Sequence, residues 1–171
     1  MTEHTKSTAE AHVVRPGTAE YVPLPHGGGF ELLADAVHTG GALGANRLAL
    51  GEGADGARPH YHALSSELFH VLDGTMDFYL DGELVTVGRG GLVVVPPGMP
   101  HAFGAVAGES ADVLAVLTPG IDRYEYFRTL GRIQHGLDSF DRLLPEQDRY
   151  DVHFLDAGAW RSAPRADRLT P

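Results

Sequence analysis

Two histidines and a glutamate stand close together in a pattern that could hold a metal ion. His60 and His62 are separated by one residue, and Glu67 follows five residues after His62. Alternate residues of a β-strand point to the same face, so the two histidines are expected to face one spot. Glu67 lies an odd number of residues from His62, which in a straight strand would put it on the opposite face. The segment 63–66 must therefore bend or bulge if Glu67 is to join the histidines.

A third histidine, His101, follows a rigid turn. The apolar run 92–95 ends at the Pro-Pro-Gly turn 96–98, and the chain resumes at His101. Three imidazoles and one carboxylate suit a divalent first-row metal and can leave one or two coordination positions open. The His-x-His pair alone is weak evidence, because histidines are common on solvated strands. The chain has no cysteine, so thiolate catalysis and cysteine-based metal sites are excluded.

Composition places the chain among soluble globular proteins. It has 171 residues, of which 43% are apolar, and its formal net charge is −10. This length allows one domain with a core, and the negative charge disfavours nucleic acid and anionic membranes as partners. The first residues carry no apolar run typical of a signal peptide, and no stretch approaches transmembrane length. We therefore expect a cytoplasmic protein.

Short apolar runs between glycines and prolines predict an all-β domain. The runs cover 30–37, 46–50, 67–72, 75–80, 83–87, 91–96 and 111–119. Strands of this length and spacing are typical of a sandwich or barrel, and no helical crossovers separate them. The prediction divides the chain into a flexible tail (1–17), a β-barrel domain (18–119) and a C-terminal helical extension packing on the barrel (120–171).

One hairpin can be predicted in register. Asp81 and Gly82 have the composition of a two-residue turn that needs positive φ angles. Across this turn Phe78 should face Val85, one pair on the apolar side of the hairpin. Met76 should face Val87 on the same side.

The pattern becomes helical after Pro119. Apolar residues recur every three positions at Ile121, Tyr124, Phe127 and Leu130. Asp122 and Glu125 could form a capping pair, and Gly131 fits the end of a helix. The segment 138–155 predicts a second short helix followed by a short strand.

The complete spacing resembles the two motifs of the cupin superfamily. It reads His60-x-His62-x4-Glu67-x6-Gly74 and then Gly90-x5-Pro96-x-Gly98-x2-His101. This resemblance implies a small antiparallel jelly-roll barrel (a double-stranded β-helix) with the metal inside, and His60, His62, Glu67 and His101 as its ligands. The motifs would lead with glycine at position 54 and close with asparagine at 105, but both positions are alanine. Neither is a ligand position.

The resemblance extends beyond the barrel. The segments 118–132 and 143–155 look like the C-terminal extension of single-domain bacterial quercetinases (flavonol 2,4-dioxygenases), which also use the His-x-His-x4-Glu spacing. It covers roughly residues 20–160. It implies an enzyme that acts on a small aromatic flavonoid with O2, and a homodimer. One divalent transition metal per chain is expected: nickel, cobalt, manganese or iron, although copper and zinc suit the same donors.

An enol-bearing aromatic substrate suggests roles for the site residues. Glu67 would be both a metal ligand and the catalytic base that takes the enol proton, before dioxygen insertion and ring cleavage. An aromatic substrate also needs an apolar pocket, for which the candidates are barrel and helix side chains, although side chains at such spacing are usually core. These candidates are Met76, Phe78, Val85, Phe103, Tyr124 and Phe127.

The same metal site allows other functions, and not every histidine is expected to be a ligand. The same metal could act only as a Lewis acid in a cyclase, isomerase or dehydratase of a polyketide-type metabolite, or the cupin could bind a small molecule without catalysis. Strand parity puts His70 on the opposite face from Glu67, so it is not expected to be a ligand. His135 is expected to be solvated. The remaining candidates, His4, His12 and His26, lie in predicted tail or loop.

Overall fold

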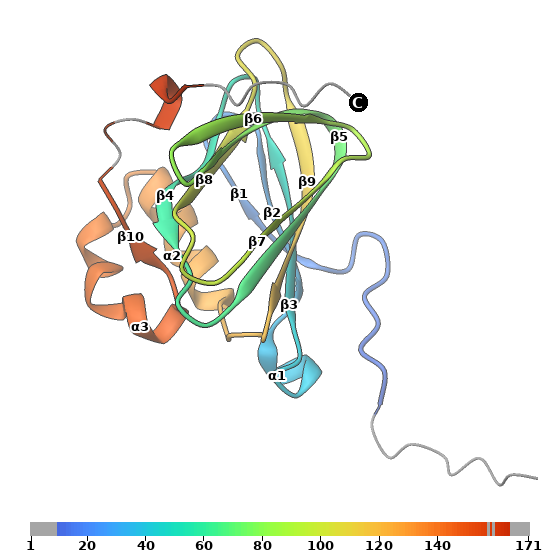
Figure 1. Cartoon of the computed structure of the whole chain (residues 1–171). Coiled ribbons are helices and arrows are strands. Elements are labelled where there is room, and N and C mark those ends of the chain that lie inside the picture. The colour runs from blue at the N-terminus through green and yellow to red at the C-terminus, as the bar shows by residue number, and fades with distance from the viewer. Residues whose placement is uncertain (1–9, 157, 159, 165–171) are drawn as a thin grey trace, which may run out of the picture.

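A computed structural model describes residues 10–156, 158 and 160–164 of the chain (Figure 1). Residues 1–9 of the predicted tail, including His4, lie outside the described residues. The strands are β1 (Glu20–Pro23), β2 (Gly28–Ala34), β3 (Gly44–Leu50), β4 (Asp55–Tyr61), β5 (Ser66–Leu80), β6 (Glu83–Gly88), β7 (Leu92–Val95), β8 (His101–Ala105), β9 (Ala111–Thr118) and β10 (His153–Phe154). The helices are α1 (Ala36–Thr39), α2 (Tyr124–Gln134) and α3 (Gln147–Tyr150), with 3-10 turns η1 (Phe140–Arg142), η2 (Leu144–Glu146) and η3 (Trp160–Ser162).

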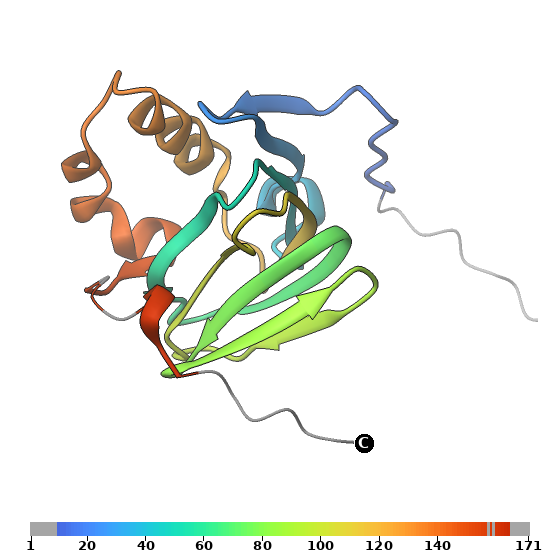
Figure 2. The same cartoon turned by 90° about the horizontal axis from the view of Figure 1, so that it is seen from above.

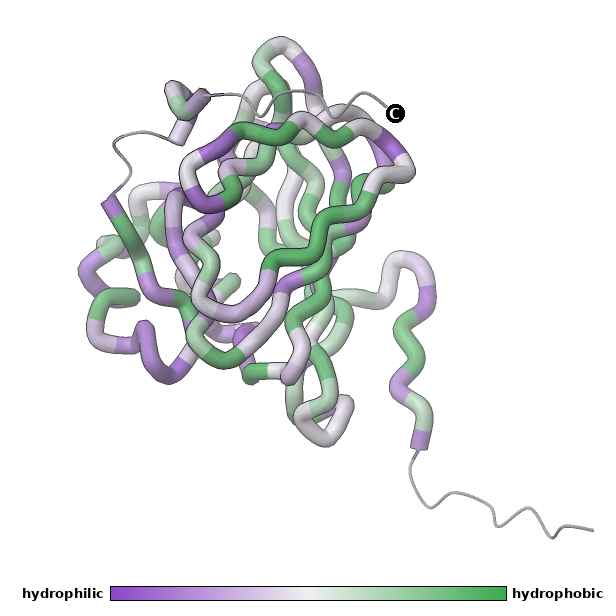
Figure 3. Tube along the Cα trace, viewed as in Figure 1, coloured by the Kyte–Doolittle hydropathy of each residue, from purple (hydrophilic) through white to green (hydrophobic). Residues whose placement is uncertain are grey.

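The strands form one curled antiparallel sheet, which confirms the predicted all-β jelly-roll architecture. Within the described residues the order is β1-β2-β3-β9-β5-β8-β4-β10, with β6 and β7 pairing only with β5. Antiparallel pairing throughout agrees with the absence of long crossover connections in the sequence. Figure 3 shows hydrophobic stretches along the strands of the sheet, where alternate side chains enter the core.

Strand β5 connects the two walls of the barrel. The sequence suggests separate strands at 67–72 and 75–80, but the structure joins them into one 15-residue strand. Its first half pairs with β7 and β9, and its second half with β6 and β8. Gly74 stands where the strand changes partners, with a φ of 71°. A Cβ there would collide with the Ser110 carbonyl, so this motif glycine permits the bend.

The predicted β5–β6 hairpin is confirmed in its register. Phe78 lies opposite Val85, and Met76 lies opposite Val87. The turn residues Asp81 and Gly82 have φ angles of 47° and 101°. Positive φ at both positions is what a two-residue hairpin turn of this kind requires.

The extension packs beside β4. Figures 1 and 2 show its helices gathered on one side of the barrel, and β10 adds to the sheet there. In this pairing His153 lies opposite Tyr61 and Phe154 lies opposite His60. Among the described helices, none has both the length and the apolarity that crossing a membrane requires.

The ends of α2 differ from the sequence interpretation. Asp35, not Asp122, caps the helix, because its carboxylate accepts the backbone N–H groups of Arg123 and Tyr124 at 2.6 and 3.1 Å. Asp122 instead accepts the N–H of Val37. The predicted stop at Gly131 was also wrong. The helix continues to Gln134, and Gly131 is buried inside it.

Replacing Gly131 with alanine should lower the free energy of unfolding. An exposed helical glycine usually gains about 1 kcal/mol from this change. Here, however, a Cβ would collide with the Val22 side chain, so the close approach of α2 to β1 explains the glycine. Denaturant unfolding of Gly131→Ala tests this, with the partly exposed Arg128→Ala as a control on the same helix. A stabilised Gly131→Ala protein would contradict this account.

Candidate metal centre

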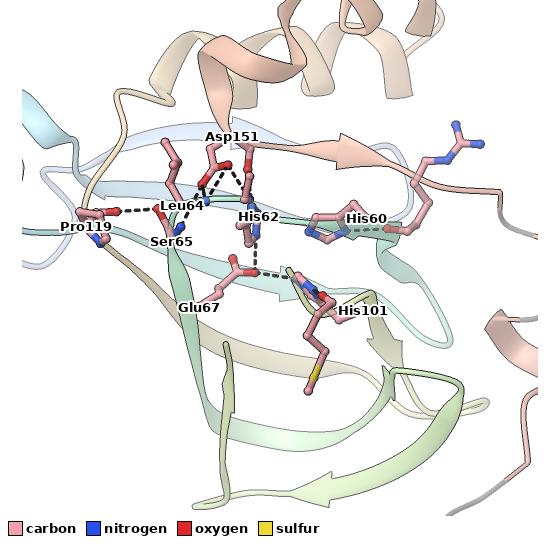
Figure 4. Close-up of polar contacts among 11 residues, drawn as sticks. His60, His62, Leu64, Ser65, Glu67, His101, Pro119 and Asp151 are labelled. Atoms are coloured by element: carbon pink, nitrogen blue, oxygen red, sulfur yellow. Dashed lines mark hydrogen bonds and ion pairs between the residues drawn. The ribbon is translucent and has the colours of Figure 1, made fainter. Parts of the chain in front are cut away.

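Four side chains meet inside the barrel. One ligand atom each from His60, His62, Glu67 and His101 lies within 4.8 Å of all the others. The four residues are between 1% and 7% exposed, so water has little access to them. Figure 4 shows the Glu67 carboxylate lying between His62 and His101. The structure thus brings together every residue expected as a metal ligand, from β4, the segment after it, β5 and β8.

The required bend after His62 is confirmed. Strand β4 ends at Tyr61, the backbone bends at residues 63–64, and β5 begins at Ser66. The Ser65 hydroxyl donates to the Pro119 carbonyl at 2.8 Å and helps to fix this segment. As a result Glu67 Oε2 lies 2.9 Å from His62 Nε2 and 3.0 Å from His101 Nε2.

Asp151, from the extension, holds the same bend from outside the barrel. Its carboxylate accepts the backbone N–H groups of Ala63, Leu64 and Ser65 at 2.6 to 3.2 Å (Figure 4). Asp151 itself is buried and has a φ of 50°, a conformation that costs energy for a residue other than glycine. Nothing in the local sequence pattern indicated this role.

The second motif is joined to the first by a backbone hydrogen bond and by strand pairing. Gly98 has a φ of 80°, and its backbone N–H donates to the His62 carbonyl at 2.7 Å. His101 then pairs with His60 across strands β4 and β8. The two alanines at the non-matching motif positions are also joined, since Ala105 N–H donates to the Ala54 carbonyl at 2.9 Å.

Backbone carbonyls orient all three imidazoles. His60 Nδ1 lies 2.7 Å from the Arg58 carbonyl oxygen, and His101 Nδ1 lies 2.9 Å from that of Met99. His62 Nδ1 lies 2.5 Å from the Asp151 carbonyl oxygen. A carbonyl only accepts, so each Nδ1 carries the proton. In the neutral rings, each Nε2 therefore presents a lone pair to the centre, which is the tautomer that metal ligation needs.

The electrostatics of the cluster favour a bound cation. Burial acts to raise the pKa of Glu67, but the adjoining His62 and His101 side chains outweigh it and hold that pKa well below its usual value. Burial, together with the charges of His101 and His62, lowers the pKa of His60 well below its usual value. An ionised carboxylate and a neutral His60 are the forms that bind metal.

This donor set fits a divalent transition metal but does not select one. Three neutral nitrogens and one carboxylate oxygen suit manganese, iron, cobalt, nickel, copper and zinc. His70 is not part of the cluster; it lies between Leu92 and Leu114 of the neighbouring strands. His135 Nδ1 contacts the Gly131 carbonyl, and His12 Nε2 contacts that of Leu33.

Two adjoining cavities lead to the cluster. The larger has a volume of about 350 Å³ and reaches His60, while the smaller has about 30 Å³ and reaches both His60 and Glu67. Apolar and aromatic side chains dominate the larger cavity, including Phe30, Leu50, Leu130, Phe140 and Phe154. A volume of this size is typical of small-molecule sites. His26, which was predicted to lie in a loop away from the site, also lines the larger cavity.

The predicted pocket residues divide into two groups. Phe103 and Phe127 line the smaller cavity, and Tyr124 lines a separate narrow space that also reaches Glu67. The other three line neither of the two cavities that reach His60: Met76 and Phe78 are buried in the core, and Val85 is partly buried.

Several cavity residues were missed by the sequence analysis. Tyr126 and Leu130 of α2 line both cavities, and an i, i+4 spacing would have found them. Phe154 of β10 carried no such signal, because its position depends on pairing with β4.

Comparison with known proteins agrees with the fold and the cluster. The family described as "Cupin domain" matches residues 46–117, a stretch that contains both motifs. Residues 46–117 of the chain thus match a cupin domain. The chain is similar to quercetin 2,3-dioxygenase of Bacillus subtilis (strain 168), with 29% identity over 163 residues, covering 86% of this chain and 48% of the relative.

A second curated relative points to different chemistry. Polyketide synthase CurC of Streptomyces cyaneus is 30% identical over 93 residues, covering 54% of this chain and 60% of the relative. The chain thus spans about half the length of one relative and three-fifths of the other.

Solved structures support the fold alone, because their sequence identities are low. An RmlC-like cupin from Shewanella frigidimarina matches with a TM-score of 0.56 and 19% identity, covering 68% of this chain and 96% of that one. The polyketide cyclase RemF from Streptomyces resistomycificus matches with a TM-score of 0.53 and 20% identity, covering 73% and 98%.

Proposed function

We propose that this protein is a metal-dependent cupin dioxygenase that cleaves a flavonol-like or other enol-bearing aromatic substrate. The observation that carries the proposal is the orientation of three Nε2 atoms and one carboxylate toward a common point beside an aromatic-lined cavity. The similarity to a quercetin 2,3-dioxygenase supports this choice of reaction and substrate.

The site residues have distinct roles in this proposal. His60, His62, His101 and Glu67 would hold one divalent metal, which supplies a Lewis acid that favours ionisation of the substrate enol and its reaction with dioxygen. Glu67, ionised because of its neighbours, takes the enol proton on a carboxylate oxygen. Phe30, Phe140 and other apolar side chains of the larger cavity position the ring system and exclude water.

Metal content and oxygen uptake test this function. We expect one transition metal per purified chain by elemental analysis, and oxygen uptake matching loss of 3-hydroxyflavone or quercetin. Treatment with a chelator should abolish turnover, and adding back nickel, cobalt, manganese or iron should show which ion restores it. Product formation at the same rate under argon would refute the dioxygenase, and a chain without stoichiometric metal would refute any metal enzyme.

A second candidate is a metal-dependent cyclase, isomerase or dehydratase of a polyketide-type compound. The similarity to polyketide synthase CurC favours it, and the same cavity suits a polycyclic aromatic body. In this case the metal acts only as a Lewis acid and oxygen is not consumed. The argon experiment separates the two candidates.

Two expectations about the protein's context stay predictions. One is a cytoplasmic location, and the other is a homodimer. Both belong to the proposed function as a small quercetinase-like cupin.

A further inference from the structure

One buried charged side chain beside the candidate metal centre has no role in the fold or mechanism described above. Arg123 precedes helix α2 and is only 8% exposed. Its Nε is buried and has no hydrogen-bond partner. No ion pair within the described part of the chain includes Arg123, whereas Arg47 and Arg128 pair with carboxylates nearer the surface.

The position of Arg123 is fixed by contacts that give its guanidinium no salt bridge. Its backbone N–H is bound by Asp35, and its guanidinium carbon lies 5.0 Å from the ring centre of Tyr126 and 5.3 Å from that of Phe127. Aromatic faces stabilise a cation without using its N–H donors. The guanidinium is therefore held in place while its buried Nε–H stays without a hydrogen-bond partner.

Arg123 lines the cavity that leads to the metal ligands. It shares the smaller cavity with His60, Glu67 and Tyr126, and it also lines the narrow space beside Glu67 and Phe127. The Glu67 Oε2 atom lies 2.9 Å from His62 Nε2 and 3.0 Å from His101 Nε2, as part of the candidate metal cluster. The Asp35 carboxylate is bound to backbone N–H groups. Both carboxylates near this arginine are thus already occupied.

A buried guanidinium without a direct salt bridge is costly, and the cost falls when an anion binds it. We propose that Arg123 forms a subsite for an ionised oxygen, an enolate or a carboxylate, on the aromatic substrate. This subsite rests on the proposed function, which places the substrate in the cavities beside His60. It deepens that function by requiring an acidic substrate.

The cavity volumes set the orientation of the substrate. The smaller cavity, of about 30 Å³, holds one or two water-sized groups, which suits a single acidic oxygen. The larger cavity, of about 350 Å³, suits the aromatic body. The two share Phe30, His60 and Tyr126, so they adjoin. The acidic oxygen therefore points inward to Arg123, and the rings extend outward.

Tyr126 completes the subsite as a hydrogen-bond donor. Burial raises the pKa of Tyr126 to about 12, although the charge of Arg123 and a hydrogen bond from its side chain act in the opposite direction. Tyr126 thus stays protonated at neutral pH and offers an O–H rather than a phenolate. A phenolate there would repel an anionic ligand, whereas the phenol can donate to it.

Matched probe pairs test the subsite. The first pair is 3-hydroxyflavone and 3-methoxyflavone, which differ in an ionisable enol. The second is 3-hydroxy-2-naphthoate and its amide, which differ in a carboxylate. Calorimetric titration of each probe is done with metal-free and zinc-loaded wild type, Arg123→Met, Arg123→Lys and the control Arg128→Met.

We expect Arg123→Met to bind the acidic member of one pair about 10- to 100-fold more weakly, which is the effect of losing hydrogen bonds to a charged group. Binding of the neutral member should change by less than about threefold. The pair that responds identifies the acidic oxygen as enolate or carboxylate. Arg123→Lys should retain part of the preference, because it keeps the charge but loses the planar fork. Arg128→Met should bind all four probes as wild type does.

A folded Arg123→Met protein that binds both acidic probes as tightly as wild type would overturn the subsite. If this variant does not fold, as judged by thermal unfolding, Arg123→Gln replaces it in the titrations, because full affinity for the acidic probes without the positive charge would likewise overturn the subsite. The metal-free titrations separate this outcome from failure of the proposed function. An acidic preference that depends on Arg123 without metal stands even if no oxygen is consumed.

Discussion

Glu67→Gln should lower turnover by about 100-fold or more, the usual contribution of a general base. Glutamine nearly matches glutamate in shape but has no charge, so it cannot take the enol proton. Its amide NH2 or carbonyl would also replace the carboxylate that lies 2.9 Å from His62 Nε2 and 3.0 Å from His101 Nε2. Metal binding should therefore weaken as well.

Measuring kcat and metal content together separates the two roles of Glu67. Stoichiometric metal with lost turnover would identify Glu67 as the base, whereas loss of both would identify it as a ligand whose removal empties the site. The exposed Glu83→Gln provides a matched control and should retain both properties. Unchanged turnover in metal-loaded Glu67→Gln would mean that another group takes the proton.

Asp151→Asn is expected to weaken both the fold and the metal centre. The charged carboxylate accepts N–H groups from three consecutive residues, 63–65. Asparagine tolerates the φ of 50° but offers one oxygen, and its NH2 would face backbone donors. We expect the free energy of unfolding to fall by about 2–4 kcal/mol. Metal affinity should fall by about 10- to 100-fold, the usual effect of disturbing a group that orients a ligand.

Denaturant unfolding and competition with a metal chelator measure these two effects. Asp148→Asn is the matched control, since Asp148 is an exposed aspartate in the adjoining helix α3. It should change neither quantity by more than about 0.5 kcal/mol. Wild-type metal affinity in Asp151→Asn would show that the 62–67 segment holds its shape without the extension.

Local rules predicted the parts of the site that depend on neighbouring residues. Strand alternation excluded His70 and required the bend between His62 and Glu67, and the Asp-Gly turn fixed the register of β5 and β6. These features depend on backbone geometry over a few residues, which the sequence pattern expresses directly.

Contacts between distant segments could not be predicted in this way. Asp151 lies more than 80 residues from the bend it holds, and Asp35 caps a helix 88 residues further on. The choice of pocket residues failed for a related reason. Met76, Phe78 and Phe103 are all buried, and Phe78 lies opposite Phe103 across β5 and β8, but only Phe103 lines the cavity that reaches the metal cluster. Which of these residues borders the cavity depends on the tilt and curvature of the strands, which alternation does not reveal.

The pairing of β10 with β4 couples docking of the extension to metal binding at the candidate centre. His60 lies opposite Phe154, and the Asp151 carbonyl binds His62 Nδ1, so two of the four candidate ligands have neighbours on the same short stretch of chain. Metal binding would fix those two histidines, and it would therefore also favour docking of the extension onto the barrel. By reciprocity, docking raises the affinity for the ion by the same factor. The enclosing wall of the cavity and the cation would therefore assemble cooperatively.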